Sequence, residues 1–174
     1  GNERMSSINR QTDAYPRWGS GEIATGKIEL VGAKSDATNV FQPGEPFRVR
    51  VHFEASAECR KPVFGLGVYR SDGTYVNGSN HDWRETPIEL DVVRAGAKGF
   101  VEMAFESLPL LQGSYYLTVF VYDHAKAAPP PIDHREHAVA FEVHDARALQ
   151  HGILFLPTRW SVEIDGADPL VSES

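Results

Sequence analysis

Apolar and polar residues alternate along most of the chain after residue 25. The run FRVRVHFEA at 47–55 is the clearest case, with phenylalanines and valines on one face and charged or polar residues on the other. This period of two is typical of β-strands that bury one face. The same pattern recurs in GKIELVGA at 26–33, VFGLGVY at 63–69, GFVEMAFES at 99–107, SYYLTVFVYD at 114–123, HAVAFEVHD at 137–145 and RWSVEI at 159–164.

Turn-forming sequences separate these runs, and no segment shows a sustained helical period beyond about one turn near DARALQHG. About seven or eight short strands joined by turns, without alternating helices, predict an antiparallel β-sandwich. We assign residues 17–150 to this sandwich. Residues 1–16 have no apolar period and are predicted to be a linker. The turns are QPGEP at 42–46, SDG at 71–73, RAGAKG at 94–99, LLQG at 110–113 and AAPPPIDH at 127–134.

Composition narrows the choice of partners more than the choice of fold. The 174 residues carry a formal net charge of −7, which argues against nucleic acid or an anionic membrane surface as the main partner. No stretch approaches the roughly 20 apolar residues that a membrane-spanning helix needs. Cys59 is the single cysteine, so an internal disulfide is excluded and a reducing compartment such as the cytoplasm is favoured.

Motifs for other chemistry are incomplete in this sequence. GEIATGKI at 21–28 has the glycines and lysine of a phosphate loop, but Ile28 stands where a magnesium-binding hydroxyl is required and a strand follows. His134 and His137 lie three residues apart without a cysteine, which favours ordinary hydrogen bonding over zinc ligation. Cys59 has no evident base, and the loop aspartates are typical turn formers, so glycoside hydrolysis is a minor alternative. We therefore expect no catalytic residue, metal or cofactor.

The stretch FGLGVYRSDGTYVNGSNHD at 64–82 carries the most informative pattern. If its phenylalanine, leucine and valine face the core, then Gly65, Gly67 and Tyr69 lie on the opposite face. The strand at 114–123 is apolar or aromatic on both faces, so it is either covered twice or carries an exposed aromatic face. Glycines beside tyrosines would form a shallow depression floored by rings, which suits the C–H faces of sugars. A covering loop or second subunit explains the same pattern equally well.

The candidate carbohydrate site combines a ring platform, two glycines and polar side chains for sugar hydroxyls. Its residues are Gly65, Gly67, Tyr69, Asn77, Asn80, His81, Asp82, Tyr116, Phe120 and Tyr122. Replacing Gly67 by leucine is expected to fill the depression and abolish binding without loss of the fold. A protein-interaction module that docks a protein on the same aromatic face is the alternative function.

Several phrases, in this order, are similar to one protein family. They are RWGSGE at 17–22, NVFQPGEPFRVRVHFEA at 39–55, PVFGLGVYRSDGTYVNGSN at 62–80, LPLLQGSYYLTVFVYD at 108–123, DHREHAVAFEV at 133–143 and GILFLPTRW at 152–160. Together they resemble the C-terminal carbohydrate-binding domain of Wzt, the ATP-binding subunit of bacterial O-antigen ABC transporters. The resemblance covers residues 17–160 or so.

The resemblance implies an immunoglobulin-like β-sandwich that follows an ATPase domain, with residues 1–16 as the tether between them. It implies a non-catalytic domain that recognises O-antigen polysaccharide in the cytoplasm, peripheral to the inner membrane, before a transmembrane transporter subunit exports it. It also implies a homodimer in which a C-terminal strand, here within an arm at 151–174, is exchanged between subunits. Such an exchange would provide another cover for the aromatic face.

Overall fold

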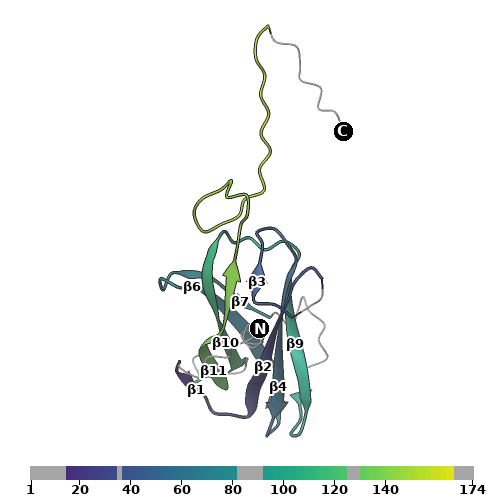
Figure 1. Ribbon diagram of the computed structural model, residues 1–174. Helices are drawn as coiled ribbons and strands as arrows, with labels where there is room; N and C mark the ends of the chain where they lie inside the picture. Colours follow the sequence, from purple (N-terminus) through teal and green to yellow (C-terminus); the bar gives the residue numbers. More distant parts are fainter. Residues whose placement is uncertain (1–14, 35–36, 82–91, 125–129, 167–174) are drawn as a thin grey trace, which may run out of the picture.

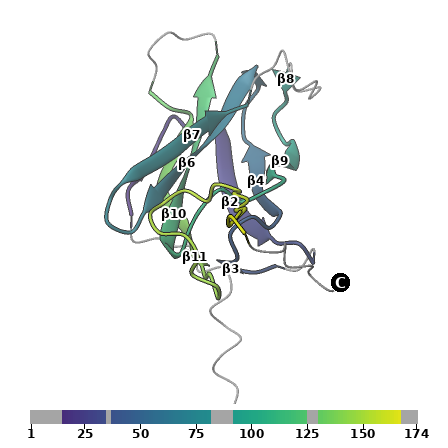
Figure 2. The ribbon, with the colours of Figure 1, turned by 90° about the horizontal axis from the view of Figure 1, so that it is seen from above.

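The computed structural model describes residues 15–34, 37–81, 92–124 and 130–166, and this part of the chain is built from strands and turns without a helix. Two antiparallel sheets form two layers (Figures 1 and 2). Sheet A has the strand order β1-β11-β10-β6-β7, with β3 parallel to β11, and sheet B has the order β2-β4-β9. The strands are β1 Arg17–Trp18, β2 Ile23–Val31, β3 Val40–Phe41, β4 Phe47–Ala55, β5 Cys59–Arg60, β6 Pro62–Arg70, β7 Tyr75–Asn80, β8 Val92–Val93, β9 Lys98–Phe105, β10 Gly113–Asp123 and β11 Asp133–Val143.

The all-β, antiparallel prediction is confirmed, and the alternation in the sequence accounts for the core. Val49 and Val51 of β4 and Leu117 and Val119 of β10 point between the sheets, and each is at most 2% exposed. Tyr115 is also fully buried, and its hydroxyl donates a hydrogen bond to the carbonyl oxygen of Leu111 at 2.7 Å. This bond satisfies the polar end of the ring inside an apolar core. None of the described residues belongs to a helix that could cross a bilayer.

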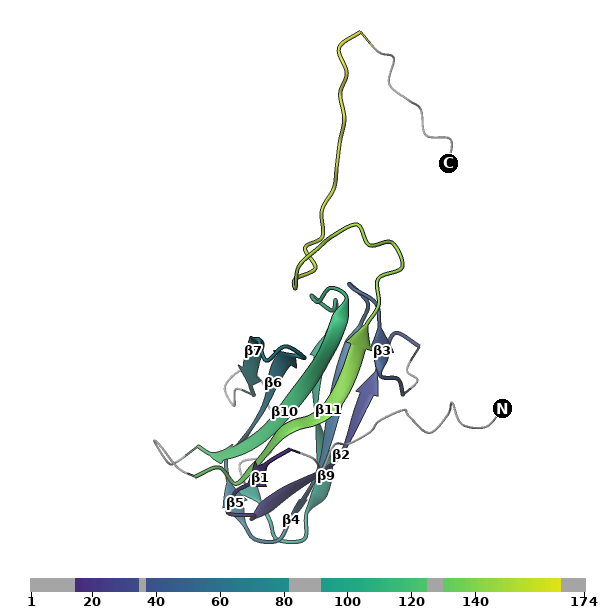
Figure 3. The same ribbon diagram turned by 60° about the vertical axis from the view of Figure 1, so that its left-hand side comes forward.

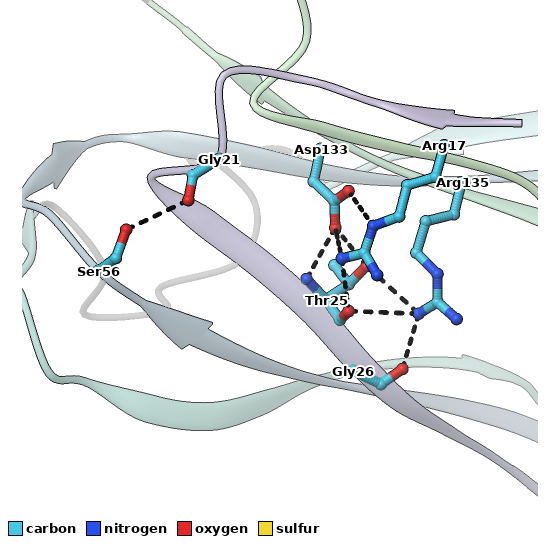
Figure 4. Close-up of polar contacts among 7 residues, drawn as sticks. All are labelled: Arg17, Gly21, Thr25, Gly26, Ser56, Asp133 and Arg135. Atoms are coloured by element: carbon cyan, nitrogen blue, oxygen red, sulfur yellow. Dashed lines mark hydrogen bonds and ion pairs between the residues drawn. The ribbon is translucent and has the colours of Figure 1, made fainter.

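A polar cluster joins the two sheets where β1 and β11 pass β2 (Figure 4). The Asp133 carboxylate accepts hydrogen bonds from the backbone N–H and the hydroxyl of Thr25, at 2.7 and 2.6 Å. It also forms an ion pair with Arg17 at 2.9 Å. Arg135 donates a hydrogen bond to the carbonyl oxygen of Gly26 at 2.7 Å. Because Asp133 and Arg135 are buried, these bonds replace their lost water, and they hold β1 against the sandwich.

The C-terminal segment leaves the sandwich and extends away from it (Figures 1 and 3). A strand is predicted at 159–164, but within the described chain these residues pair with no other strand. Trp160, Val162 and Ile164 alternate along the segment and are 90%, 83% and 65% exposed. An alternating apolar face left this exposed is typical of a segment that packs on a partner.

Candidate functional site

The outer face of sheet A carries aromatic residues that do not belong to the core. The register sets Tyr116 of β10 opposite Tyr69 of β6, and Phe120 opposite Gly65. Their neighbours along each strand point into the core, so alternation turns these side chains outward. Tyr122 continues the outward set of β10. Four predicted platform residues, the three tyrosines and Phe120, thus share one face.

One ring cluster, which we call the Tyr116 cluster, consists of Tyr15, Tyr69, Tyr75, Tyr116 and His137. Tyr116 and His137 stack with ring centres 4.7 Å apart and planes 13° from parallel. Tyr69 lies 4.9 Å from Tyr75 and 5.3 Å from His137. The ring centre of Tyr15 lies 4.6 Å from that of His137. Tyr75 is 58% exposed, so one ring of this cluster offers much of its surface to a ligand.

An irregularity in β11 brings His137 into this cluster. The ladder with β10 shifts between Leu117 and Val119, so that Thr118 lies opposite several residues of β11. His137 sits there with a φ of +45°, and its backbone N–H donates a hydrogen bond to the Thr118 hydroxyl at 3.1 Å. Simple alternation with Val139 would turn His137 towards the core. The left-handed conformation, uncommon outside glycine, turns its ring outward instead.

A second ring cluster, the Trp18 cluster, contains Trp18, Phe120, Tyr122 and His134. Trp18 stacks on His134 with ring centres 4.0 Å apart and planes 17° from parallel. Phe120 lies 6.0 Å from His134 and 5.3 Å from Tyr122. Pairing of β1 with β11 sets Trp18 directly opposite His134, and Trp18 remains 44% exposed. The loop cover considered from the sequence is thus partly realised by the chain's own residues before β2.

The glycines of β6 and β7 let rings lie flat on the sheet. A Cβ at Gly65 would come within 1.8 Å of the Phe120 ring and 2.5 Å of the side-chain oxygen of Asn80. A Cβ at Gly78 would meet the Tyr75 hydroxyl at 1.8 Å. At Gly67 the nearest atoms are ring edges, of Tyr69 at 3.2 Å and Tyr75 at 3.5 Å. The depression predicted over both β6 glycines therefore differs in detail, because Phe120 and Asn80 fill the space above Gly65.

The predicted polar partners separate into two groups. Asn80 is exposed and lies on the ring-bearing face, opposite Gly65. Asn77 is paired with Val68, whose side chain belongs to the core-facing set, so Asn77 does not share that face. His81 follows β7 and, together with Asn80, lines a cavity of about 310 Å³ near the edges formed by β7 and β9. Asp82 lies outside the described residues.

The pKa shifts of Tyr69, Tyr116 and His134 all favour the uncharged form of the side chain. Burial, and then the neighbouring Tyr75 and Glu136, raise the pKa of Tyr69. A hydrogen bond with Tyr15 is the main reason that the pKa of Tyr116 is raised. Burial lowers the pKa of His134, although Glu136 opposes that shift. The arrangement thus offers neutral ring faces, phenol hydroxyls and an amide, which suit stacking and hydrogen bonding.

The described residues offer no site for a metal ion comparable to the ring clusters. No group of three or more His, Cys, Asp or Glu side chains among them is placed to hold a metal ion. His134 and His137, for which the sequence favoured ordinary hydrogen bonding over zinc ligation, each stack on aromatic rings.

Comparison with solved structures shows the fold. A crystal structure of the C-terminal domain of Wzt superposes with a TM-score of 0.77 at 16% sequence identity, covering 88% of this chain and 91% of that chain. The CARDB domain of the PF1109 protein from Pyrococcus furiosus, solved with di-metal ions, reaches a TM-score of 0.36 at 13% identity, over 78% of this chain and all of that one. No curated protein matches the chain.

The family comparison is more specific than the structural one. The family model of the Wzt C-terminal domain matches residues 15–156, which include every strand of both sheets. The resemblance seen in the sequence is therefore confirmed. The chain belongs to the Wzt C-terminal domain family, whose members are non-catalytic parts of the ATPase subunit of O-antigen ABC transporters.

Proposed function

We propose that this domain binds the O-antigen polysaccharide on the outer face of sheet A. The observation that carries the proposal is the presence, on one sheet face, of two ring clusters with exposed members, Trp18 at 44% and Tyr75 at 58%. Sugar rings stack their C–H faces on such aromatic surfaces, and the phenol groups and Asn80 supply partners for hydroxyls. Binding of each sugar is weak, since sugar hydroxyls lose water on binding.

In this proposal the domain selects its cargo at the cytoplasmic side of the inner membrane. The ATPase domain precedes it, residues 1–16, of which 1–14 lie outside the described residues, form the tether, and the transmembrane subunit exports the selected polysaccharide. The domain contributes recognition rather than catalysis. Membership of the Wzt C-terminal domain family supports this setting.

Affinity electrophoresis tests the proposal with O-polysaccharide released from the lipopolysaccharide of the source strain. Retardation by this glycan, and not by an unrelated serotype, is the expected result. Trp18→Ala and Tyr75→Ala should each reduce the retardation. Phe100→Ala is the matched control, because Phe100 is 52% exposed but lies on sheet B beside Arg50 and His52. A folded protein that no cognate glycan retards would instead favour the alternative, a docking surface for a protein.

We further propose that the C-terminal arm pairs with a second copy of the chain. The exposed, alternating Trp160, Val162 and Ile164 support this, since one strand face of that kind fits an open sheet edge. Two sites in one dimer would raise the avidity for a repeating glycan. Light scattering should give the molar mass of a dimer for the purified protein and that of a monomer for the Trp160→Asp variant. Ser161→Asp, on the other face of the arm, should leave the dimer intact, whereas an unaffected Trp160→Asp dimer would exclude the arm as its basis.

A further inference from the structure

The two ring clusters are too far apart to bind the same sugar. Tyr116 and Phe120, one in each cluster, are separated by four residues along β10, a distance of about 14 Å in an extended strand. Thr118, Gly67 and Gly78 lie between them in neighbouring strands, and none carries a large side chain. A ligand that touches both clusters must therefore be a run of several sugars, with different residues of the glycan on each cluster.

The arginines in the strands of sheet A are turned away from the two ring clusters. Its strands contain three arginines and no lysine. Arg17 binds Asp133, and Arg135 donates to the carbonyl of Gly26, both in the polar cluster between the sheets. Arg70 is paired with the core residue Tyr115 at the end of β6. In the described strands of sheet A, no arginine is thus placed to pair with an anionic sugar on the rings.

Carboxylates, by contrast, lie on this face, because Glu136 and Glu142 follow the buried Arg135 and Phe141 in β11 just as His134 follows the buried Asp133. Glu136 is half-buried in β11, and its charge raises the pKa of Tyr69 in one cluster and opposes the lowered pKa of His134 in the other. Glu142 acts on Tyr116 in the same sense. Its carboxylate accepts a hydrogen bond from the Ser114 hydroxyl at 2.9 Å. A carboxylate or phosphate on the glycan would therefore meet like charge, and the described strands of sheet A offer it no lysine or arginine as a partner.

From this placement we infer that the outer face of sheet A binds a run of neutral sugars in preference to acidic ones. The inference rests on the proposed function and adds the chemical class of the glycan to it. Neutral hydroxyls can donate to Glu136, whereas a uronate or phosphate cannot. An added carboxylate at about 7 Å from Glu136 in water should weaken binding about threefold, and more where the stacked rings exclude water.

The experiment compares three forms of the O-polysaccharide released from the source strain. The first is native, the second is oxidised at its primary hydroxyls to carboxylates, and the third is the methyl ester of the second. Binding is measured by titration calorimetry at low salt and about pH 8, where imidazoles are neutral. Native polymer and methyl ester should bind alike, with the oxidised form weaker by threefold or more. Glu136→Gln should narrow that gap, and Glu54→Gln, on sheet B, should not.

Each other outcome overturns a definite step. Equal binding of the oxidised and native polymers, or equal weakening of the oxidised polymer and its ester, would overturn the charge argument and leave glycan recognition standing. So would a bound native polymer whose composition includes uronic acid or phosphate. Failure of the folded protein to bind the native polymer would instead overturn the proposed function and this inference with it.

Discussion

Adding one methyl group at Gly65 tests how the ring platform is built. The Cβ of an alanine would lie 1.8 Å from the Phe120 ring and 2.5 Å from the side-chain oxygen of Asn80. No carbon contact is that short, so the ring must move off the strand. Gly67→Ala is the matched control, because the position lies two residues along the same face of β6. There the nearest atom is a Tyr69 ring edge at 3.2 Å, which a small side-chain movement relieves.

Gly65→Ala and Gly67→Ala share one contribution that raises the free energy of unfolding and differ in the contribution that lowers it. Alanine is preferred over glycine within a strand by about 0.5–1 kcal/mol, since it restricts the unfolded chain. Overpacking costs about 1–3 kcal/mol, and only Gly65→Ala displaces a ring. We expect Gly65→Ala to lower the free energy of unfolding by about 1–2 kcal/mol. For Gly67→Ala we expect a change within about 0.5 kcal/mol of zero.

Urea unfolding followed by the β-sheet signal in circular dichroism measures both values. The destabilised variant should also melt lower, by roughly 2–4 °C for each kcal/mol in a chain of this size. Its affinity for the glycan should fall as well, because Phe120 belongs to the Trp18 cluster. Equal free energies of unfolding for the two variants would refute the reasoning that the glycine makes room for the ring.

Four further replacements test the charges. Asp133→Asn should lower the free energy of unfolding, measured in urea, by about 3 kcal/mol, because it breaks a buried ion pair. Arg17→Ala should lower it by less, because the Arg17 side chain is 46% exposed. A larger loss for Arg17→Ala than for Asp133→Asn would contradict this assignment. Burial lowers the pKa of His134, so the contribution of its neutral ring to the free energy of unfolding is complete above pH 6.5 and is lost as the pH falls. His134→Gln should flatten the melting temperature between pH 7 and 5, and an unchanged slope would exclude this origin. Hydrogen bonds, first from Lys27, lower the pKa of Glu29 from 4.5 to about 2. Glu29→Gln should therefore lower the free energy of unfolding above pH 4.5 and leave it unchanged near pH 2. A loss near pH 2 as well would indicate a different role for Glu29.

Strands that bury one face could be predicted from the sequence because apolar residues alternate with polar ones along them. The alternation at 47–55 gives the bounds of β4 as they are observed. The same alternation predicts the outward position of Tyr69, Tyr116 and Phe120. It depends only on which neighbours are apolar, and that information is complete within each strand.

Residues placed by long-range contacts could not be predicted in this way. Trp18 lies in a strand of two residues, too short to show a period, and an ion pair with a residue over a hundred positions away holds that strand. His137 faces outward only because its backbone is left-handed, which no alternation shows. Asn77 shares the polar stretch with Asn80, but its pairing with the core-facing Val68 sends it to the other side of the sheet.

The short strand β1 couples the ligand site to the chain that precedes it. Trp18 stacks on His134, and Tyr15, just before β1, reaches His137, so this one segment contacts both ring clusters. A two-residue strand is cheap to detach compared with unfolding the sandwich. A glycan that lies against Trp18 holds the segment down, and by thermodynamic reciprocity a segment held down binds that glycan more tightly by the same factor. If glycan binds at the proposed site, tension on the entering chain would therefore change its affinity, and β1 would act as a mechanical link between the two.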